Sequence, residues 1–362
     1  MWLQVSIFPL ADGALESLKI REFRTSDIVK RLGVISPSRL FISNYPIANP
    51  VAAFNPSIVL RDDELYVYVR VVMGYYLYAS AIALTKLQLN DLLSGDLSVN
   101  RYSADLVIIP TNKYDIWGCE DPRVVELDGK YYMTYVGRGV NYFNAAVKNE
   151  KTLPLTATQT SSSKWEKIAV HVLPSELRGR VIMDKDAFIT KLGGDLLLFH
   201  RPYMDDGNYY TTVSRISLEL NTMSSELGEV VAQDTRLVLL PASFEEKIGW
   251  ATPVMKVDSK TLLVLLHGVE REMGIYRVFA AEVEHSRSSG VVLKAVTPTY
   301  IMEPRTPYEV FGDRPYTVFP CGAVVVDSHK VIVSYGAADS MVGFGEIDLT
   351  ELLSLLDKGR IY

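Results

Sequence analysis

Five similar phrases recur along the chain, and each predicts two short strands joined by a polar turn. Each phrase opens with polar residues or proline, continues through a short apolar run, and turns at Asp or Gly. It then ends in a strand of aromatic and branched residues, as expected of a β-hairpin. The five phrases are FNPSIVLRDDELYVYVR from Phe54, EDPRVVELDGKYYMTYVG from Glu120, DKDAFITKLGGDLLLFHR from Asp184, ATPVMKVDSKTLLVLLHG from Ala251 and FPCGAVVVDSHKVIVSYG from Phe319.

The spacing of these hairpins predicts the fold. Equivalent places lie about 66 residues apart, which leaves room for about four short strands in each unit. We assign these places to Pro56, Pro122, Asp186, Pro253 and Pro320. A third strand is expected after each hairpin, for example in NYFNAAVK from Asn141. Five such units predict an all-β, five-bladed β-propeller, with residues 1–362 as a single domain. A pair of β-sandwiches with similar hairpins is the alternative.

Two segments predict short terminal helices outside the propeller. TSDIVKRLG has Thr25 or Ser26 as a candidate N-cap and Gly33 as a stop. DLTELLSLLDKG predicts a helix over about 348–358, capped by Asp348, with leucines at helical spacing. Residues 1 to about 50 are therefore expected to form an N-terminal extension.

Composition narrows the class of ligand and the cellular location. Hydrophobic residues make up 48% of the chain and charged residues 22%, which is typical of a globular protein. The net charge of -6, without a block of Lys or Arg, disfavours nucleic acid and anionic membranes as partners. Only Cys119 and Cys321 occur, so reduced thiols are expected, with one bridge between them left open. No export signal or transmembrane-length apolar run is evident, and we expect a cytoplasmic protein.

The propeller prediction brings distant polar residues together. Because the first strand of each blade lines the central channel, the residues that open these strands converge on one mouth of the axis. A mouth so rich in charge is costly to bury unless it binds something polar. The openings contribute Asn55, Glu120, Asp121, Arg123, Asp184, Lys185, Asp186 and Thr252, and the ends of the second strands add Arg70, Arg138, His200, Arg201 and His267.

The segment EDPR permits two interpretations. Asp before Pro is a common turn residue, and Arg123 can form an ion pair with either neighbouring acid. Alternatively, one of Glu120 and Asp121 projects into the cavity, where burial favours its protonated form and it serves as a general acid towards a glycosidic oxygen.

Other residues suggest contacts to a sugar and an anion. His200 and Arg201, beside Lys185 or Lys191, form a candidate anion site, although a histidine at a strand end is often only structural. Flat aromatic faces for sugar rings are available, although many aromatics in β-proteins serve packing. These aromatics are Trp117, Trp250, Tyr75, Tyr76, Tyr114 and Tyr308. No metal-binding motif, phosphate loop, serine-nucleophile elbow or dinucleotide fingerprint is present, so neither a metal nor a cofactor is expected.

Six ordered motifs carry a resemblance to a known family. FNPS, EDPR, FHRP, LLHGV, VFPCG and YGAADSMVG, from Phe54 to near the end of the chain, resemble glycoside hydrolase family 130. This family contains β-mannoside phosphorylases and related β-mannosidases, and its fold is a five-bladed propeller. The resemblance therefore implies an enzyme that cleaves a small oligosaccharide or mannoside with inversion.

The resemblance also implies roles for individual residues. Asp121 matches the proton donor, whose proton reaches the glycosidic oxygen through a sugar hydroxyl, while inorganic phosphate attacks the anomeric carbon to give mannose 1-phosphate. Phosphate is then a co-substrate rather than a cofactor. The implied phosphate-binding residues are Arg138, Lys185, His200 and Arg201. The implied substrate-binding residues are Asn55, Arg70, Glu120, Arg123, Asp186, Trp250, His267 and Asp339.

Departures from the family pattern leave alternatives open. GWATPV replaces the family's GAGPPP and places Trp250 near the cavity, while NYFNAAV lacks an expected arginine that Arg138 could replace. The family's NS before FNP is also missing. If Glu270 or Glu303 takes the place of the cationic cluster, water is the nucleophile and the enzyme is an inverting hydrolase. A sugar-binding propeller without catalysis, or a five-bladed glycosidase with three separate acids, remains a further alternative. The linkage cleaved and the oligomeric state stay open, with a homo-oligomer as one option.

Overall fold

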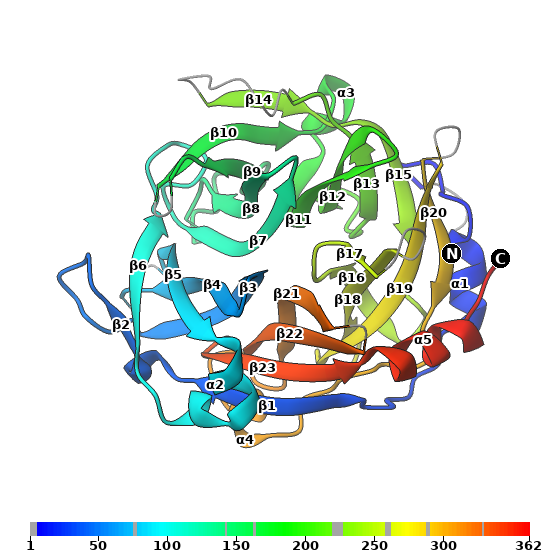
Figure 1. The fold of residues 1–362 in the computed structure, drawn as a ribbon. Helices are drawn as coiled ribbons and strands as arrows, with labels where there is room; N and C mark the ends of the chain where they lie inside the picture. Colours follow the sequence, from blue (N-terminus) through cyan, green and yellow to red (C-terminus); the bar gives the residue numbers. More distant parts are fainter. Residues whose placement is uncertain are drawn as a thin grey trace.

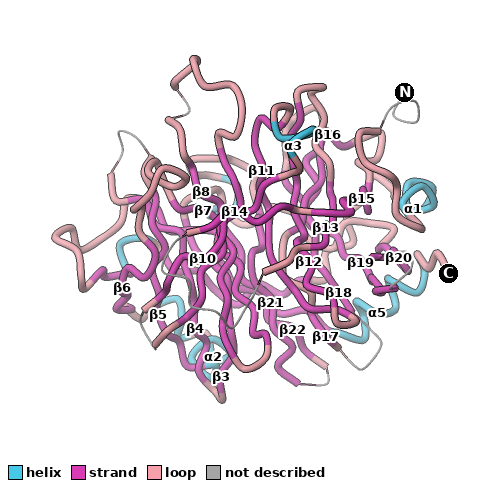
Figure 2. The backbone as a smooth tube through the Cα atoms, turned by 90° about the horizontal axis from the view of Figure 1, so that it is seen from above, coloured by secondary structure: helices cyan, strands magenta, loops and turns pink. Residues whose placement is uncertain are grey.

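Five β-sheets stand around a central channel like the blades of a propeller (Figure 1). The structure is a computed structural model, and it describes residues 6–74, 78–141, 143–161, 164–218, 227–257, 262–286, 290–327 and 329–362. Most strands run between the two faces of the ring, as the side view shows (Figure 2). The predicted all-β, five-bladed propeller is therefore confirmed.

The first three blades follow one another along the chain, each starting with its innermost strand. Blade 1 contains β3 (Ala52–Arg61), β4 (Glu64–Val72), β5 (Ser80–Gln88) and β6 (Tyr102–Ile108), with β2 (Leu40–Ile42) parallel to β6. Blade 2 contains β7 (Cys119–Leu127), β8 (Lys130–Arg138), β9 (Thr152–Gln159) and β10 (Trp165–Val172), with β14 (Gly228–Val231) parallel to β10. Blade 3 contains β11 (Val181–Leu192), β12 (Asp195–Met204), β13 (Thr211–Arg215) and β15 (Gln233–Leu239).

The last two blades vary this plan. In blade 4 the inner position is shared by two strands, because β16 (Glu245–Trp250) and β17 (Met255–Lys256) both pair with β18 (Leu262–Glu270). Outside them lie β19 (Tyr276–Ser286) and β20 (Gly290–Val296). Blade 5 contains β21 (Val318–Asp327), β22 (Lys330–Ala337) and β23 (Met341–Asp348), and its outer strand is β1 (Val29–Ile35) from the start of the chain.

The strand β1 closes the ring and corrects one prediction. Residues 25–33 were expected to form a helix, but Val29–Ile35 pair antiparallel with β23 instead. The edge of β23 offers a row of unpaired backbone groups, and pairing with them outweighs the local helix signal. Because β1 and β2 both belong to blades, residues 1 to about 50 are not simply an extension outside the propeller.

Short helices and turns complete the chain. The helix expected at the C-terminus is present as α5 (Leu349–Lys358), where Asp348 caps the first turn by accepting a 3.0 Å hydrogen bond from the Glu351 N–H. The other helices are α1 (Ala14–Ile20), α2 (Leu89–Ser94), α3 (Ser175–Arg178) and α4 (Pro307–Val310), with 3₁₀ turns at Pro37–Arg39 and Asp96–Ser98. The third strand of blade 2 is β9, and not the NYFNAAVK segment from Asn141 as predicted. Within the described ranges, no helix is long and apolar enough to cross a membrane.

Apolar clusters between neighbouring blades hold the ring together. Tyr68 of blade 1 and Tyr135 of blade 2 share one cluster, and Val264 of blade 4 packs in another with Phe188 of blade 3. Each sheet is thus buried on both faces, which explains why the hairpin strands are almost continuously apolar instead of alternating. Burial of such side chains stabilises the fold by roughly 1.5–3 kcal/mol each.

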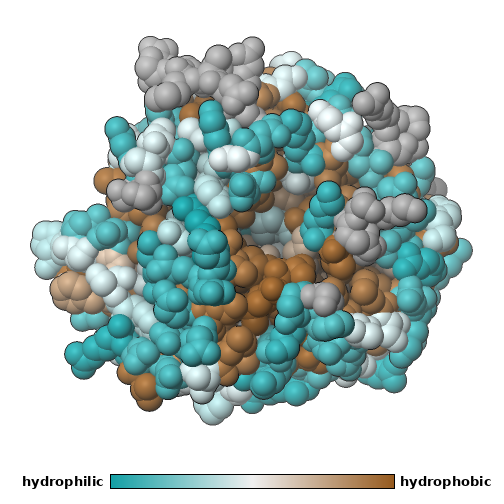
Figure 3. Space-filling model, viewed as in Figure 1, coloured by the Kyte–Doolittle hydropathy of each residue, from teal (hydrophilic) through white to brown (hydrophobic). Residues whose placement is uncertain are grey.

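The two ends of the central channel differ in chemistry. One end is a cavity of about 400 Å³ lined mainly by apolar residues from the later parts of the inner strands, such as Ile58, Val124 and Val324. Figure 3 shows a hollow at the centre of the ring with a largely hydrophobic wall. The openings of the same strands carry the polar residues that the sequence singled out, and they form the other end.

Candidate active site

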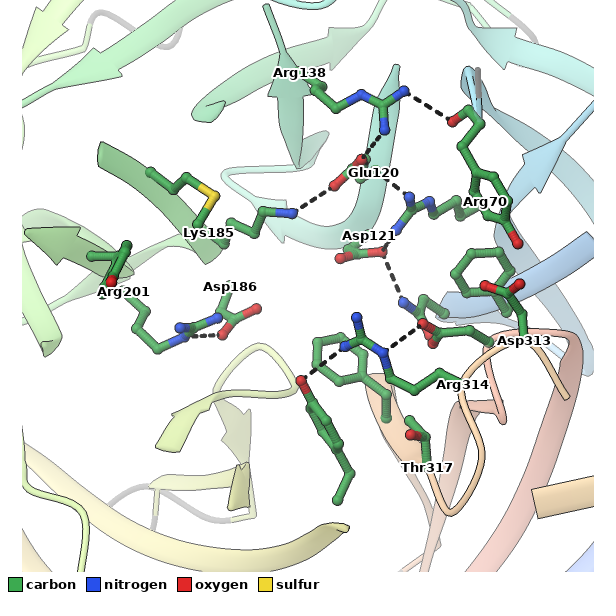
Figure 4. Close-up of a pocket in the computed structure, with 18 of the residues that line it drawn as sticks. Arg70, Glu120, Asp121, Arg138, Lys185, Asp186, Arg201, Asp313, Arg314 and Thr317 are labelled. Carbon is green, nitrogen blue, oxygen red and sulfur yellow. Dashed lines mark hydrogen bonds and ion pairs between the residues drawn. The ribbon is translucent and has the colours of Figure 1, made fainter. Parts of the chain in front are cut away.

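A cavity of about 720 Å³ occupies the polar end of the channel and draws residues from all five blades (Figure 4). Its walls are strongly charged and nearly balanced. The carboxylates are Glu120, Asp121, Asp186, Asp313 and Asp339, and the basic side chains are Arg70, Arg138, Lys185, Arg201, Lys247 and Arg314. This confirms that the strand openings converge, and a cavity of this size suits a small polar ligand.

A β-bulge directs each of three equivalent residues into the cavity. The inner strands β3, β7 and β11 each contain a bulge near their openings. Asn55, Asp121 and Asp186 lie at these bulges with φ of 49°, 50° and 55°. Asn and Asp adopt this left-handed conformation more readily than other non-glycine residues. Asp186 is therefore equivalent to Asn55 and Asp121, and its assignment to the proline position, Pro122 in β7, was wrong by one residue.

Asp121 points into the cavity with one oxygen anchored and the other unbonded (Figure 4). Its Oδ1 accepts a 2.8 Å hydrogen bond from Asn55 Nδ2 and a 2.9 Å bond from Arg70 Nη1. No donor among the described residues bonds to Oδ2. A carboxyl held in this way keeps a fixed direction while one oxygen stays available to carry a proton.

Glu120, although adjacent in sequence, is locked by cations. Its Oε2 lies 2.9 Å from Lys185 Nζ, and its Oε1 lies 3.1 Å from Arg70 Nη2 and 3.7 Å from Arg138 Nη1. Burial alone would raise the pKa of Glu120, but Arg70, Lys185 and Arg138 outweigh burial and lower it to about 2. Glu120 is therefore a permanent anion that holds three basic side chains around the cavity.

Asp186 is also surrounded by nitrogen groups. Its Oδ2 bonds to Arg201 Nε and lies 3.4 Å from His267 Nε2, while its Oδ1 lies 3.8 Å from Arg123 Nη2. Burial opposes ionisation, but Arg201, His267 and Arg123 together hold the pKa of Asp186 well below its usual range. A Cβ at Gly249 would collide with this carboxylate, so the glycine lets the β16 backbone pass close beside it.

Lys247 differs from the other basic residues of the cavity. In the described part of the chain no carboxylate lies within 4.0 Å of Lys247, whereas each of the other five cavity cations has one. Its Nζ lies 4.9 Å from the centre of the Tyr209 ring, as does the guanidinium carbon of Arg201. Burial and the neighbouring Arg201 lower the pKa of Lys247 to about 8. Lys247 thus adds a positive charge without a close carboxylate partner, which suits an anion.

Asp339 lies on the same side of the cavity as Asp121. Arg314 Nε lies 3.5 Å from its Oδ2 and Nη1 donates a 2.9 Å hydrogen bond to the Tyr276 hydroxyl. Burial raises the pKa of Asp339 to about 6, although Arg314 and Arg70 oppose the rise. A carboxyl of this kind can both donate and accept hydrogen bonds near neutral pH.

Four predicted site residues do not line the cavity. His200 is fully buried, with Nδ1 at 2.7 Å from Asp184 Oδ2 and Nε2 at 2.8 Å from Ser214 Oγ, so it joins three strands of blade 3. Trp250 packs edge-on against Phe199 in the core. The sequence signal misled because successive side chains of a strand point to opposite faces of the sheet, and position in the repeat does not show which of them reach the cavity.

His267 and Arg123 are buried beneath the cavity. His267 contacts Asp186 and the Phe319 ring, with its ring centre 4.6 Å from that of Phe319. Arg123 is 0% exposed and binds backbone carbonyls. Both therefore support the cavity floor instead of contacting a ligand. The remaining predicted residues, which are Asn55, Arg70, Glu120, Asp121, Arg138, Lys185, Asp186, Arg201 and Asp339, do line the cavity.

The aromatic lining of the cavity also differs from expectation. Trp117, Tyr114 and Tyr308 do not line the cavity, and Tyr75 and Tyr76 lie outside the described residues. The aromatic residues that do line it are Phe54, Tyr78, Phe143, Tyr203, Tyr209, Tyr276 and Phe319.

The two glutamates proposed for hydrolysis are engaged elsewhere. Glu270 accepts backbone hydrogen bonds of 2.6 and 2.9 Å from the turn after β18. Glu303 Oε2 lies 3.2 Å from Arg277 and accepts a 2.7 Å hydrogen bond from Thr25. Neither lines the cavity.

Sequence reasoning missed Lys247, Arg314 and Tyr209. Lys247 precedes Trp250 by three residues on β16 and so faces the opposite side of the sheet; because Trp250 was assigned to the cavity, alternation directed Lys247 away from it. Arg314 and Tyr209 come from loops between strands, where no periodic pattern indicates direction.

Comparisons with known proteins identify the family of the chain. Residues 19–358 match the sequence model of glycoside hydrolase family 130, described as beta-1,4-mannooligosaccharide phosphorylase. A Beta-1,2-mannobiose phosphorylase of Thermoanaerobacter sp. is 26% identical over 327 residues, covering 85% of this chain and 96% of the relative. A 1,2-beta-oligomannan phosphorylase of the same organism is 27% identical, covering 66% of this chain and 71% of the relative.

A solved structure shows the same fold. The beta-1,2-mannobiose phosphorylase from Listeria innocua, in complex with beta-1,2-mannobiose, has a TM-score of 0.68 at 18% identity, covering 91% of this chain and 99% of that chain. Because the family match extends over nearly the whole sequence, the chain belongs to glycoside hydrolase family 130.

Proposed function

We propose that this protein is an inverting β-mannoside phosphorylase, with Asp121 as proton donor and inorganic phosphate as nucleophile. The observation that carries the proposal is that two features share one cavity. Asp121 presents an unbonded carboxyl oxygen, and the cavity also holds Lys247, which has no carboxylate within 4.0 Å among the described residues. An acid facing a cationic site is the arrangement that phosphorolysis requires.

The proposed reaction conserves atoms and charge. A phosphate oxygen attacks the anomeric carbon of the mannosyl unit while the glycosidic C–O bond breaks on the opposite face, so the configuration inverts. The leaving oxygen takes the proton of Asp121 and departs as the acceptor sugar. The phosphate ester then loses a proton, which restores Asp121. In the reverse direction, the same site transfers mannose from mannose 1-phosphate to an acceptor.

The basic side of the cavity supports phosphate over water as the nucleophile. An inverting hydrolase needs a carboxylate that accepts a proton from water. Glu120 and Asp186 are held as ion pairs with lowered pKa, which makes them poor bases. We propose that Lys247, Arg201, Lys185 and Arg138 bind the phosphate oxygens, with Lys247 supplying the charge that is not already paired.

A phosphate-dependence assay tests the proposal. The enzyme is incubated with β-1,2- and β-1,4-mannobiose, with and without phosphate, and mannose 1-phosphate and mannose are quantified. We expect mannose 1-phosphate only when phosphate is present, and first with β-1,2 linkages, which the names of the two curated relatives specify. Mannose released at the same rate without phosphate would assign a hydrolase. No cleavage, together with binding of the mannosides, would assign a sugar-binding propeller.

The location and assembly of the protein remain predictions. We propose a cytoplasmic enzyme, supported by Cys119 and Cys321, which are both buried free thiols. Fractionation of cells tests the location, and size-exclusion chromatography with light scattering tests whether the protein forms a homo-oligomer.

A further inference from the structure

Arg123 occupies an unusual place, directly beneath the candidate active site. It follows the bulge of β7, so that Asp121 faces the cavity while Arg123 faces the channel interior. Its side chain is 0% exposed. The next residue, Val124, lines the apolar end of the channel. Arg123 therefore separates the polar and apolar ends.

The guanidinium of Arg123 binds backbone groups of two different blades. Its Nε donates a 2.8 Å hydrogen bond to the carbonyl of Ala251, and Nη2 donates a 2.9 Å bond to the carbonyl of Trp250. Its Nη1 donates a 3.1 Å bond to the carbonyl of Asp121 itself. With Asp186 of blade 3 at 3.8 Å, one side chain joins blades 2, 3 and 4 across the channel.

Burying the Arg123 guanidinium costs free energy that an apolar side chain of similar volume would not cost. Burying a cation without a close counter-ion is unfavourable, and replacing buried ionic groups by apolar residues is often neutral or stabilising. The fork of three donors, in contrast, fixes the direction of three carbonyls at once. One of these carbonyls belongs to Asp121, whose backbone is held in the left-handed region with φ of 50°.

The same contacts reach the phosphate side of the cavity. Trp250 and Lys247 lie on the short strand β16, and Gly249 between them passes close to the Asp186 carboxylate. By holding the end of β16, Arg123 fixes where this strand presents Lys247. The acid and the unpaired cation are thus tied to one buried group.

We propose that Arg123 is a positioning residue that sets the placement of Asp121 relative to the phosphate-binding side without touching either substrate. The inference rests on the proposed function, because it concerns the geometry of phosphorolysis. A displacement of about 1 Å in such a site can lower a rate about 100-fold. Arg123 should therefore affect kcat far more than KM for the mannoside.

The test compares R123K and R123M with R21K as a matched control. Arg21 is another buried arginine that binds the first residue of β16, with Nη2 at 2.7 Å from Glu245 Oε1, but it does not line the cavity. We expect R123K to lower kcat about 100-fold with KM for the mannoside within about threefold. R21K should lower the melting temperature while leaving kcat within about threefold.

Each outcome decides between positioning and simple stability. Wild-type kcat in folded R123K would overturn the inference, as would an equal loss of kcat in R21K. R123M supplies the same comparison if R123K does not fold, and its crystal structure should show Asp121 released from Asn55 and Arg70. If the wild-type enzyme itself shows no phosphorolysis, the proposed function fails; an active wild type with unaffected Arg123 variants contradicts only the positioning role.

Discussion

Asp121 and Asp186 occupy the same backbone position on adjacent blades, yet their surroundings are opposite. Both lie at a bulge near the opening of an inner strand, with φ of 50° and 55°. Asp121 has one oxygen held by Asn55 and Arg70 and the other unbonded, whereas both oxygens of Asp186 face cationic groups. The repeat thus sets where a carboxyl lies, and its neighbours set what that carboxyl can do.

The difference extends to the two sides of the cavity. On the side of Asp121, burial raises the pKa of Asp339 to about 6, so protons are held there near neutral pH. On the side of Asp186, carboxylates remain ionised and Lys247 adds a further positive charge. The cavity therefore combines a carboxyl that holds its proton near neutral pH with cations that favour binding an anion, and phosphorolysis uses both.

The largest expected effect comes from the variant D121N. An amide cannot donate the proton that the leaving sugar requires, so phosphorolysis should fall at least ~1,000-fold. The melting temperature should change little, because Asn can still accept the bonds from Asn55 and Arg70. Initial rates and thermal unfolding measure both quantities. A variant that retains the full rate would remove Asp121 from its proposed role.

The matched variant D186N should lose more stability and less activity than D121N. Removing this carboxylate leaves Arg201 and Arg123 buried without their counter-charge, which costs about 3 kcal/mol of stability. Phosphorolysis should decline less than in D121N, because Asp186 does not supply the proton. Urea unfolding and initial rates test this prediction. If D186N is the more inactive and the more stable variant, the two aspartates have been assigned the wrong way round.

Lys247 tests the anion side directly. In K247M the unpaired charge is lost while the stem is preserved, and KM for phosphate should rise about tenfold, equivalent to about 1.4 kcal/mol of binding. KM for the mannoside should stay nearly constant. K256M, an exposed lysine on β17, serves as the control and should leave both constants unchanged. An equal rise in both KM values would argue against a specific phosphate contact.

The smallest effect concerns the pH dependence of stability near Asp339. Its pKa is raised from 3.8 to about 6 in the folded protein, so its proton binds more tightly in the folded than in the unfolded state. This contribution is fully present below about pH 4 and is lost as the pH rises through 6. Wild type should therefore lose stability relative to D339N between pH 4 and 7, as measured by urea unfolding. The exposed variant D63N provides the control, and parallel curves for wild type and D339N would contradict the prediction.

Much of the fold could be predicted because the repeats are local. Each hairpin carries its own turn and apolar strands, so its existence follows from nearby residues. The helix predicted over residues 25–33 was wrong because the structure there depends on a distant segment. Residues in this stretch form strand β1, which exists only by pairing with β23 at the far end of the sequence.

Part of the site could be predicted for the same reason. The bulge at the opening of an inner strand places Asp121 and Asp186 in the cavity; both were expected at strand openings, although Asp186 was aligned one residue out of register. His200 and Trp250 failed because the local sequence does not show which side of a blade a residue near a strand end faces. Arg314 was missed because it lies in a loop.

The sequence by itself determined the repeat, the family and the carboxyl at Asp121, because these depend on local pattern and ordered motifs. Only the tertiary structure decided which carboxylates form ion pairs and which cation lacks a close carboxylate partner. That outcome depends on contacts between blades, such as Arg123 with Ala251 and Glu120 with Lys185, whose partners are far apart along the chain. Charge balance in a buried cavity is a sum over all its walls, and no single segment contains that sum.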